Sequence, residues 1–247
     1  MAAVILLQTS RLTRQFGGLL AVNNVDFKLA RGEIRAIIGP NGAGKTTLVS
    51  LICGRIPQTA GRVVFDSEDV TSLPAHARVQ RGIAYTFQIT SVYGNLAAFD
   101  NVALAVQSSM QRGQSGWRPL DTGVLAQRVD EALNRVGLAE LRDTRANEMA
   151  YGHQRLLEIA MGLGLTPKLL ILDEPTQGLS DAEIANFCQL VRTIAKDATV
   201  LLIEHNMAVV MELARRITVM DRGAILAEGT PDEIRADPAV QRAYLGG

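Results

Sequence analysis

A glycine-rich stretch that ends in a lysine and two threonines carries the clearest chemistry of the sequence. Residues 39–47 read GPNGAGKTT and match the spacing G-x-x-x-x-G-K-[ST]. Glycines without Cβ bulk let backbone N–H groups converge on phosphate oxygens, so Lys45 is expected to reach the terminal phosphates of a nucleotide and Thr46 to ligate Mg²⁺. The apolar run 34–38 before the motif and the helix-compatible segment 47–53 after it disfavour a mere connecting turn. The predicted phosphate-binding residues are Gly39, Pro40, Asn41, Gly42, Ala43, Gly44, Lys45, Thr46 and Thr47.

Two further apolar runs end in side chains suited to phosphate chemistry. The run 169–172 is followed by Asp173 and Glu174, and the run 199–203 is followed by Glu204 and His205. Buried parallel strands deliver such residues to the edge of the sheet where ligands bind. Asp173 is therefore a candidate Mg²⁺ ligand, Glu174 a candidate base that deprotonates water, and His205 a candidate γ-phosphate ligand. The alternative for Asp173 and Glu174 is an acidic turn after a strand.

Two other candidates depend more on context. Phe16 lies between predicted strands at 4–8 and 25–29, where it could stack a nucleobase for about 1–3 kcal/mol or simply fill the core. Gln88 follows a short predicted strand at 83–87, and by its position alone it is most simply a solvated strand end.

The remaining pattern alternates strands with helices. Apolar spacing of three and four residues predicts helices at 99–106 and 124–136 inside a helical region 96–165. A polar loop, 107–116, should join them, with Trp117 as a packing anchor. Further predicted elements are a strand 61–65, helices 74–80, 181–196 and 238–245, a hairpin of 217–220 with 224–227, and capping boxes at Ser180–Glu183 and Thr230–Glu233.

Composition narrows the class of protein. The 247 residues are 47% hydrophobic and carry 25 Lys+Arg against 25 Asp+Glu, a balance that argues against a nucleic-acid partner. Cys53 and Cys188 lie in apolar helical stretches, which predicts buried reduced thiols and a cytosolic compartment. No apolar run approaches the roughly 20 residues of a membrane span, so any membrane role should come through a partner.

With these pieces in order, the chain resembles an ATP-binding subunit of an ABC transporter along nearly its whole length. The stretches 16–24, 86–88, 156–160, 202–206 and 243–246 look like those of the branched-chain (hydrophobic) amino-acid uptake subfamily. The resemblance implies an α/β P-loop NTPase with a RecA-like core, an antiparallel β subdomain and a helical subdomain at about 89–165. Residues 1–247 would form a single ABC nucleotide-binding domain.

The resemblance also assigns roles. It implies ATP and Mg²⁺ as cofactors, Phe16 as the adenine-stacking aromatic, and Glu174, His205 and Gln88 as catalytic residues. It makes Thr46, Gln88 and Asp173 the metal ligands. The expected activity is ATP hydrolysis coupled to a conformational change of a permease.

The implied partners are a second ABC ATPase subunit, two integral-membrane permease subunits and an extracytoplasmic solute-binding protein, with no nucleic acid. The chain would lie peripherally on the cytoplasmic face of the inner (plasma) membrane. The second ATPase could be a different chain, giving a heterodimer, or a second copy, giving a homodimer.

The signature segment, which serves the partner's nucleotide in this family, departs from the pattern. Residues 149–153 read MAYGH where the usual sequence is LSGGQ, so Ala150, Gly152 and His153 are the predicted contacts. Ala150 cannot donate the usual hydroxyl bond, and Ser180 replaces the usual Asp nearby. We expect a heterodimer with two unequal ATP sites; the alternative is that the following helix N-terminus compensates.

Parts of the sequence are also compatible with other functions. Related importers of urea, amides or aromatic acids share these stretches, and 73–78 with 243–246 also occur in lipid and lipopolysaccharide exporters. A soluble ABC ATPase acting on nucleic acid or ribosomes is disfavoured by one phosphate-binding motif and no sustained heptads. The ordered set Gln88, Asp173, Glu174 and His205 argues against an unrelated P-loop kinase.

Overall fold

The computed structural model describes residues 4–86, 91–113 and 120–245, with side chains through Ala243. It divides into two compact units, one made of residues 1–78 with 191–247 and the other of residues 79–190. The first unit contains the glycine-rich loop and His205; the second contains Asp173 and Glu174.

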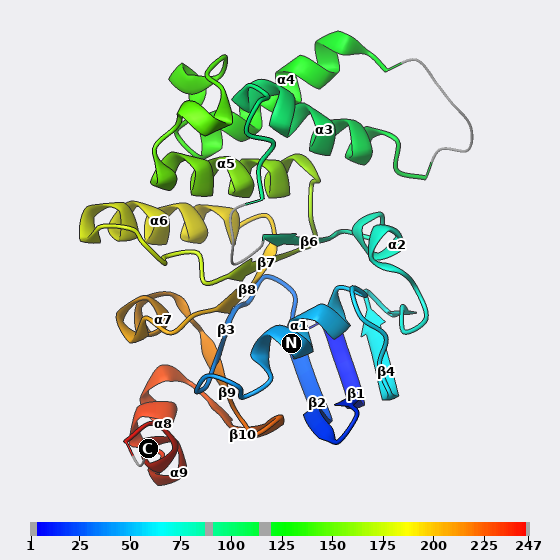
Figure 1. The fold of residues 1–247 in the computed structure, drawn as a ribbon, viewed down its shortest axis with the longest axis vertical. Coiled ribbons are helices and arrows are strands. Elements are labelled where there is room, and N and C mark those ends of the chain that lie inside the picture. Colours follow the sequence, from blue (N-terminus) through cyan, green and yellow to red (C-terminus); the bar gives the residue numbers. More distant parts are fainter. Residues whose placement is uncertain (1–3, 87–90, 114–119, 246–247) are drawn as a thin grey trace. The chain divides into compact units, whose positions relative to one another are not determined.

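An antiparallel sheet opens the first unit (Figure 1). Its strands are β1 (Ile5–Phe16), β2 (Leu19–Ala30), β4 (Ala60–Phe65) and β5 (Glu68–Asp69), in the order β2-β1-β4-β5. The predicted strands 4–8 and 25–29 are too short, because β1 and β2 continue to a two-residue turn at Gly17-Gly18 where Phe16 pairs with Leu19. Gly17 adopts a left-handed φ of 56°, which suits glycine at such a turn.

A second set of strands supplies the parallel part of the first unit. It comprises β3 (Ile34–Ile38), β8 (Thr199–Ile203), β9 (Arg216–Asp221) and β10 (Ala224–Gly229), in the order β10-β9-β3-β8. β3 runs parallel to both β8 and β9, whereas β9 and β10 form the predicted hairpin. β8 is buried at every residue, as expected of a parallel strand covered on both faces.

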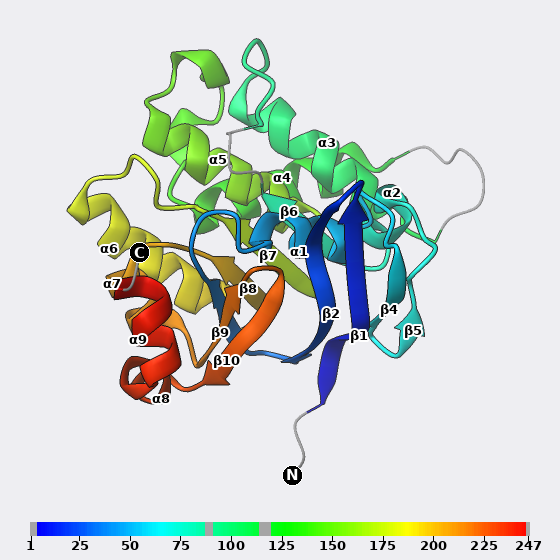
Figure 2. The same cartoon turned by 60° about the horizontal axis from the view of Figure 1, so that its bottom comes forward.

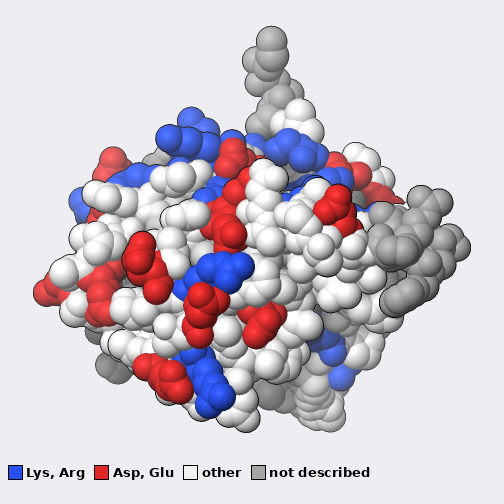
Figure 3. Space-filling view, turned by 90° about the horizontal axis from the view of Figure 1, so that it is seen from above, with Lys and Arg blue, Asp and Glu red and all other residues white. Residues whose placement is uncertain are grey.

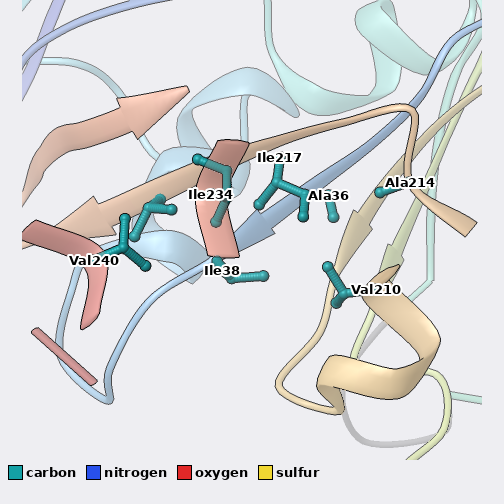
Figure 4. Packing of buried hydrophobic residues seen from close by; sticks show 8 residues of the cluster. Ala36, Ile38, Val210, Ala214, Ile217, Ile234 and Val240 are labelled. Carbon is teal, nitrogen blue, oxygen red and sulfur yellow. The ribbon is translucent and has the colours of Figure 1, made fainter. Parts of the chain in front are cut away.

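The helices of the first unit cover these strands. They are α1 (Lys45–Ile52), α2 (Ala75–Val79), α7 (Met207–Leu213), α8 (Pro231–Ala236) and α9 (Pro238–Leu245). Figure 4 shows apolar side chains of α7, α8 and α9 meeting those of β3 and β9. The cluster consists of Ala36, Ile38, Val210, Ala214, Ile217, Val219, Ile234 and Val240. The Thr230–Glu233 capping box and the last helix are confirmed.

The second unit is mainly helical around a parallel strand pair. β6 (Ile83–Thr86) pairs with β7 (Leu169–Asp173), and α3 (Ala98–Met110), α4 (Thr122–Arg135) and α5 (Tyr151–Gly164) pack together (Figure 1). Short 3₁₀ helices cover Ala139–Leu141 and Ala146–Glu148, and α6 spans Asp181–Ile194.

The predicted bounds of two helices, α3 and α6, are wrong. α3 continues to Met110, so residues 107–110 are helical rather than part of a loop. Val106 and Ser109 are buried, and the Ser109 hydroxyl donates to the Val106 carbonyl at 2.8 Å, so this polar side chain is satisfied inside the helix. α6 ends at Ile194, two residues before the predicted end. Phe87, Gln88 and Trp117 lie outside the described residues.

The cysteines, the helix lengths and the surface charges of the structure bear on what composition predicted. Cys53 and Cys188 are buried and form no disulfide in the described part of the chain, as predicted. Across the described ranges, no helix is both long and apolar enough to cross a bilayer. On the face seen in Figure 3, acidic and basic side chains are interspersed, with uncharged surface between them. Figure 2 shows β1, β2 and β4 side by side, with β5 at the edge.

Arg78 ties α1 to the segment that leads into α2. Its side chain is buried and donates to the carbonyl oxygens of Leu51 at 2.7 Å and Ile52 at 2.8 Å, which belong to the last turn of α1. It also donates to the carbonyls of Thr71 and Leu73, both at 2.9 Å. Burial lowers the pKa of Arg78, yet the group stays charged because an arginine pKa starts so high.

We predict that Arg78→Met lowers the free energy of unfolding by more than about 1.5–3 kcal/mol, the range for one hydrogen bond to a charged group. Four carbonyl groups lose their hydrogen bond to Arg78 at once. Arg31→Met is the matched control, because Arg31 forms an exposed ion pair with Asp66 that should contribute about 0–1 kcal/mol. Urea unfolding measures both; equal losses for the two variants would contradict this role of Arg78.

Candidate nucleotide-binding site

The glycine-rich loop joins β3 to α1 in a backbone shape that only glycine permits. Gly39 has a φ of 152° and Gly44 a φ of 97°. A Cβ at Gly39 would lie 2.2 Å from the carbonyl oxygen of Met220, and one at Gly44 would lie 2.3 Å from that of Ala21. Both distances are far below van der Waals contact, so the loop depends on these two glycines.

Neighbouring strands hold the loop in place. The N–H of Gly223, at the β9–β10 turn, donates to the carbonyl of Ala43 at 3.0 Å. The carbonyl of the same glycine accepts from the N–H of Asn23, in β2, at 2.7 Å. The turn therefore bridges the loop and the antiparallel sheet.

Lys45 and Thr46 stand at the start of α1. The Lys45 ammonium donates to the carbonyl oxygens of Gly39 at 2.6 Å and Pro40 at 3.0 Å, so it bends back over the loop. Gly44 occupies the N-cap, where no side chain accepts a hydrogen bond, and the first turn of α1 contains no acidic residue. The amides and the positive dipole end at this terminus suit a phosphate group.

Two strands deliver the loop and His205 to one edge of the first unit. β3 and β8 run parallel with Ile37 opposite Ile203, so Gly39 and His205 both follow the carboxyl ends of adjacent strands. The His205 side chain is 61% exposed, with Nδ1 3.9 Å from the buried carboxylate of Glu204. That carboxylate accepts the N–H groups of His205 and Asn206 at 2.9 and 3.0 Å, which shapes the turn carrying His205.

Phe16 ends β1 and is 42% exposed, so the alternative of a core phenylalanine is wrong. The Arg14 guanidinium lies 4.3 Å from the ring centroid. The ring retains accessible surface on which a base could stack, and adenine stacking stays a prediction.

In the second unit, Asp173 ends β7 and is almost fully buried. The Tyr85 hydroxyl, on the neighbouring strand β6, donates to Asp173 Oδ2 at 2.7 Å. This bond orients the carboxylate, and it was missed at the sequence level because nothing in a lone strand tyrosine indicates its partner. Glu174 follows with a left-handed φ of 47°, and its carbonyl accepts from Arg155 Nη2 at 3.4 Å.

The predicted metal ligands, Thr46, Gln88 and Asp173, lie in both units of the chain. In the part of the chain that the structure describes, no group of three or more His, Cys, Asp and Glu side chains could hold a metal. Mg²⁺ commonly binds through one or two protein oxygens and the substrate's phosphates. Thr46 is exposed in the first unit and the Asp173 carboxylate is oriented by Tyr85 in the second, and their binding of one Mg²⁺ stays a prediction. Gln88 lies outside the described residues.

The signature segment occupies the start of α5. Ala150 is the N-cap and makes no side-chain cap bond, while Gly152 and the exposed His153 lie in the first turn. The Ser180–Glu183 capping box is confirmed: Glu183 Oε2 accepts from the Ser180 N–H at 2.8 Å and from its hydroxyl at 2.6 Å. These bonds hold the pKa of Glu183 below its usual value, with a smaller contribution from the charge of His153.

Comparisons with known proteins agree with this geometry. The family model described as ABC transporter matches residues 22–177, and the one described as Branched-chain amino acid ATP-binding cassette transporter matches residues 224–247. LivG of Salmonella typhimurium, a high-affinity branched-chain amino acid transport ATP-binding protein, is 39% identical over 98% of both chains. LptB of Acidithiobacillus ferridurans, a lipopolysaccharide export system ATP-binding protein, is 33% identical over 98% of this chain and 97% of its own.

A solved structure agrees at the level of the fold. The crystal structure of a nucleotide-free ATP-binding cassette from an ABC transporter superposes with a TM-score of 0.87 and 27% identity, over 99% of this chain and 100% of that one. The predicted fold class is therefore confirmed. The chain belongs to the ABC transporter family as an ATP-binding protein, and members of this family hydrolyse ATP.

Proposed function

We propose that this chain is the ATP-hydrolysing subunit of an importer for branched-chain or other hydrophobic amino acids. The observation that carries the proposal is the match of residues 224–247 to the branched-chain family model. The higher identity to LivG than to LptB, 39% against 33%, also favours amino-acid uptake over lipopolysaccharide export.

In the proposed mechanism, loop 39–47 binds the phosphates of ATP, and Lys45 leaves its loop carbonyls to contact the β and γ phosphates. Thr46, Asp173 and Gln88 would hold Mg²⁺, which neutralises phosphate charge when bound. Glu174 orients and deprotonates the attacking water, and His205 contacts the γ-phosphate.

The proposed assembly contains three further kinds of subunit. A second ABC ATPase subunit, which we propose is a different chain, binds head-to-tail so that Ala150, Gly152 and His153 face its nucleotide. Two permease subunits carry the solute across the membrane, and an extracytoplasmic protein delivers it. The chain lies on the cytoplasmic face of the inner (plasma) membrane and acts through the permeases.

The solute class is tested by ATPase stimulation. The full chain, purified with its co-purifying subunits and its solute-binding protein in lipid, should hydrolyse ATP faster when leucine is added. Urea, an amide and an aromatic acid serve as comparison solutes. Stimulation by one of these three and not by leucine would contradict the proposed substrate class.

We predict that Glu174→Gln binds MgATP but hydrolyses it about 10²–10⁴-fold more slowly, because a positioned general base contributes a factor of that size. Phosphate release and nucleotide titration measure the two properties. Glu140→Gln is the control, because Glu140 is an exposed carboxylate in the same unit. Near-normal turnover by Glu174→Gln would remove Glu174 from the role of base.

We predict that Phe16→Ala weakens ATP and GTP binding alike by about 1–3 kcal/mol, because stacking on an aromatic ring tolerates many bases. Phe16→Tyr should leave both affinities unchanged. Leu19→Ala is the control on the same hairpin, since Leu19 is 66% exposed. If nucleotide titration gives the wild-type dissociation constant for Phe16→Ala, stacking on Phe16 is disproved.

A further inference from the structure

Arg155 belongs to a buried ion pair in α5 that the mechanism so far does not use. Its side chain is 4% exposed, and Nη1 lies 3.1 Å from Oε2 of Glu158, whose side chain is 6% exposed. Burying two charges removes their hydration, so such a pair is a poor source of stability compared with apolar packing. Stability alone therefore explains the buried Arg155 guanidinium poorly, and its other contacts become relevant.

The second terminal nitrogen of Arg155 contacts the backbone of Glu174. Nη2 donates to the carbonyl oxygen of Glu174 at 3.4 Å, and the same oxygen accepts the N–H of Gln177 at 3.2 Å. Glu174 holds a left-handed φ of 47°, which costs energy for a residue with a Cβ and persists only where surrounding contacts impose it. Arg155 is one of these contacts.

Two glycines mark where the loop that follows Glu174 comes close to the first turn of α5. A Cβ on Gly178 would lie 3.1 Å from Cε1 of Tyr151, and Arg155 lies 5.8 Å from the centroid of that tyrosine ring. A Cβ on Gly152 would lie 2.4 Å from Oε1 of Glu183. The start of α5 therefore bonds to the loop at Glu174 and lies close to it at Gly178 and Glu183.

We propose that Arg155 is a positioning residue for Glu174: its bond to the Glu174 carbonyl fixes the strained backbone and so aims the carboxylate. The inference rests on the proposed role of Glu174 as general base. A side chain leaves its Cα in a direction set by φ and ψ, so relaxation of this residue moves the carboxylate away from its water. A misplacement of about 1 Å can cost about 100-fold in rate.

The test uses the double variant Arg155→Met/Glu158→Met, which removes both buried charges together and avoids leaving one unpaired. The full chain is assayed with its co-purifying subunits. We expect turnover at saturating MgATP to fall about 10–100-fold, while the dissociation constant for ATP stays within about twofold of the wild-type value, as expected when only the transition state is affected.

Arg142→Met is the matched control. Arg142 also lies over an aromatic ring, 4.0 Å from the centroid of Phe99, and pairs with Asp130 and Asp143, but it is 37% exposed and far along the chain from Glu174. Its turnover should equal that of the wild type. If the double variant fails to fold, Arg155→Lys replaces it, because lysine keeps the charge beside Glu158 but lacks the planar guanidinium. The same fall in turnover and the same unchanged dissociation constant for ATP are expected of this variant.

A double-mutant cycle separates positioning from general damage. In a Glu174→Gln background, Arg155→Met/Glu158→Met should not lower the residual turnover further, because a residue that acts through the carboxylate has no effect once the carboxylate is gone. A further loss in that background, or weakened ATP binding by the double variant, would overturn the inference.

The outcomes also separate this inference from the function on which it rests. Wild-type turnover by the Arg155 variant, with Glu174→Gln inactive, overturns the positioning role alone. Wild-type turnover by Glu174→Gln instead overturns the role of Glu174 as base, and the positioning inference falls with it.

Discussion

The close approach of backbone to backbone around the glycine-rich loop is the constraint on which the nucleotide site depends. Gly39 and Gly44 place their Cα atoms where a Cβ would collide with the carbonyl oxygens of Met220 and Ala21. The loop is thus clamped between β2 and the β9–β10 hairpin, two elements almost two hundred residues apart in sequence. The phosphate site is a product of this packing as well as of the motif.

A similar constraint governs the carboxylates in the other unit. Asp173 is buried at the end of β7 and takes its orientation from the Tyr85 hydroxyl, while Glu174 sits in a left-handed conformation bonded through its carbonyl to Arg155. Both arrangements hold polar groups where desolvation makes them costly, so each needs a dedicated partner. The partners lie on β6 and α5, so these two elements orient the carboxylate of Asp173 and the backbone of Glu174 as well as packing.

The sequence predicted the features that depend on neighbouring residues. The phosphate-binding spacing, the two capping boxes, the hairpin at β9–β10 and the buried strands all follow from local patterns, and the structure contains them. The full length of β1 and β2 and the bonds of Tyr85 to Asp173 and of Arg155 to Glu174 could not be predicted, because each depends on contacts with residues distant in the chain. Arg155 gave no signal, since an arginine inside a helix is ordinarily a solvated side chain.

The central claim is that phosphate binding by this loop drives the uptake of branched-chain amino acids. It is tested most directly by leucine uptake into proteoliposomes that contain the full chain with its co-purifying subunits, with MgATP on the side of the membrane that this chain occupies and the solute-binding protein on the other. The account predicts ATP-dependent accumulation of leucine that is abolished by Lys45→Met, because this lysine carries the charge that meets the terminal phosphates. Leucine uptake that proceeds without ATP, or that survives Lys45→Met at the wild-type rate, would contradict the account.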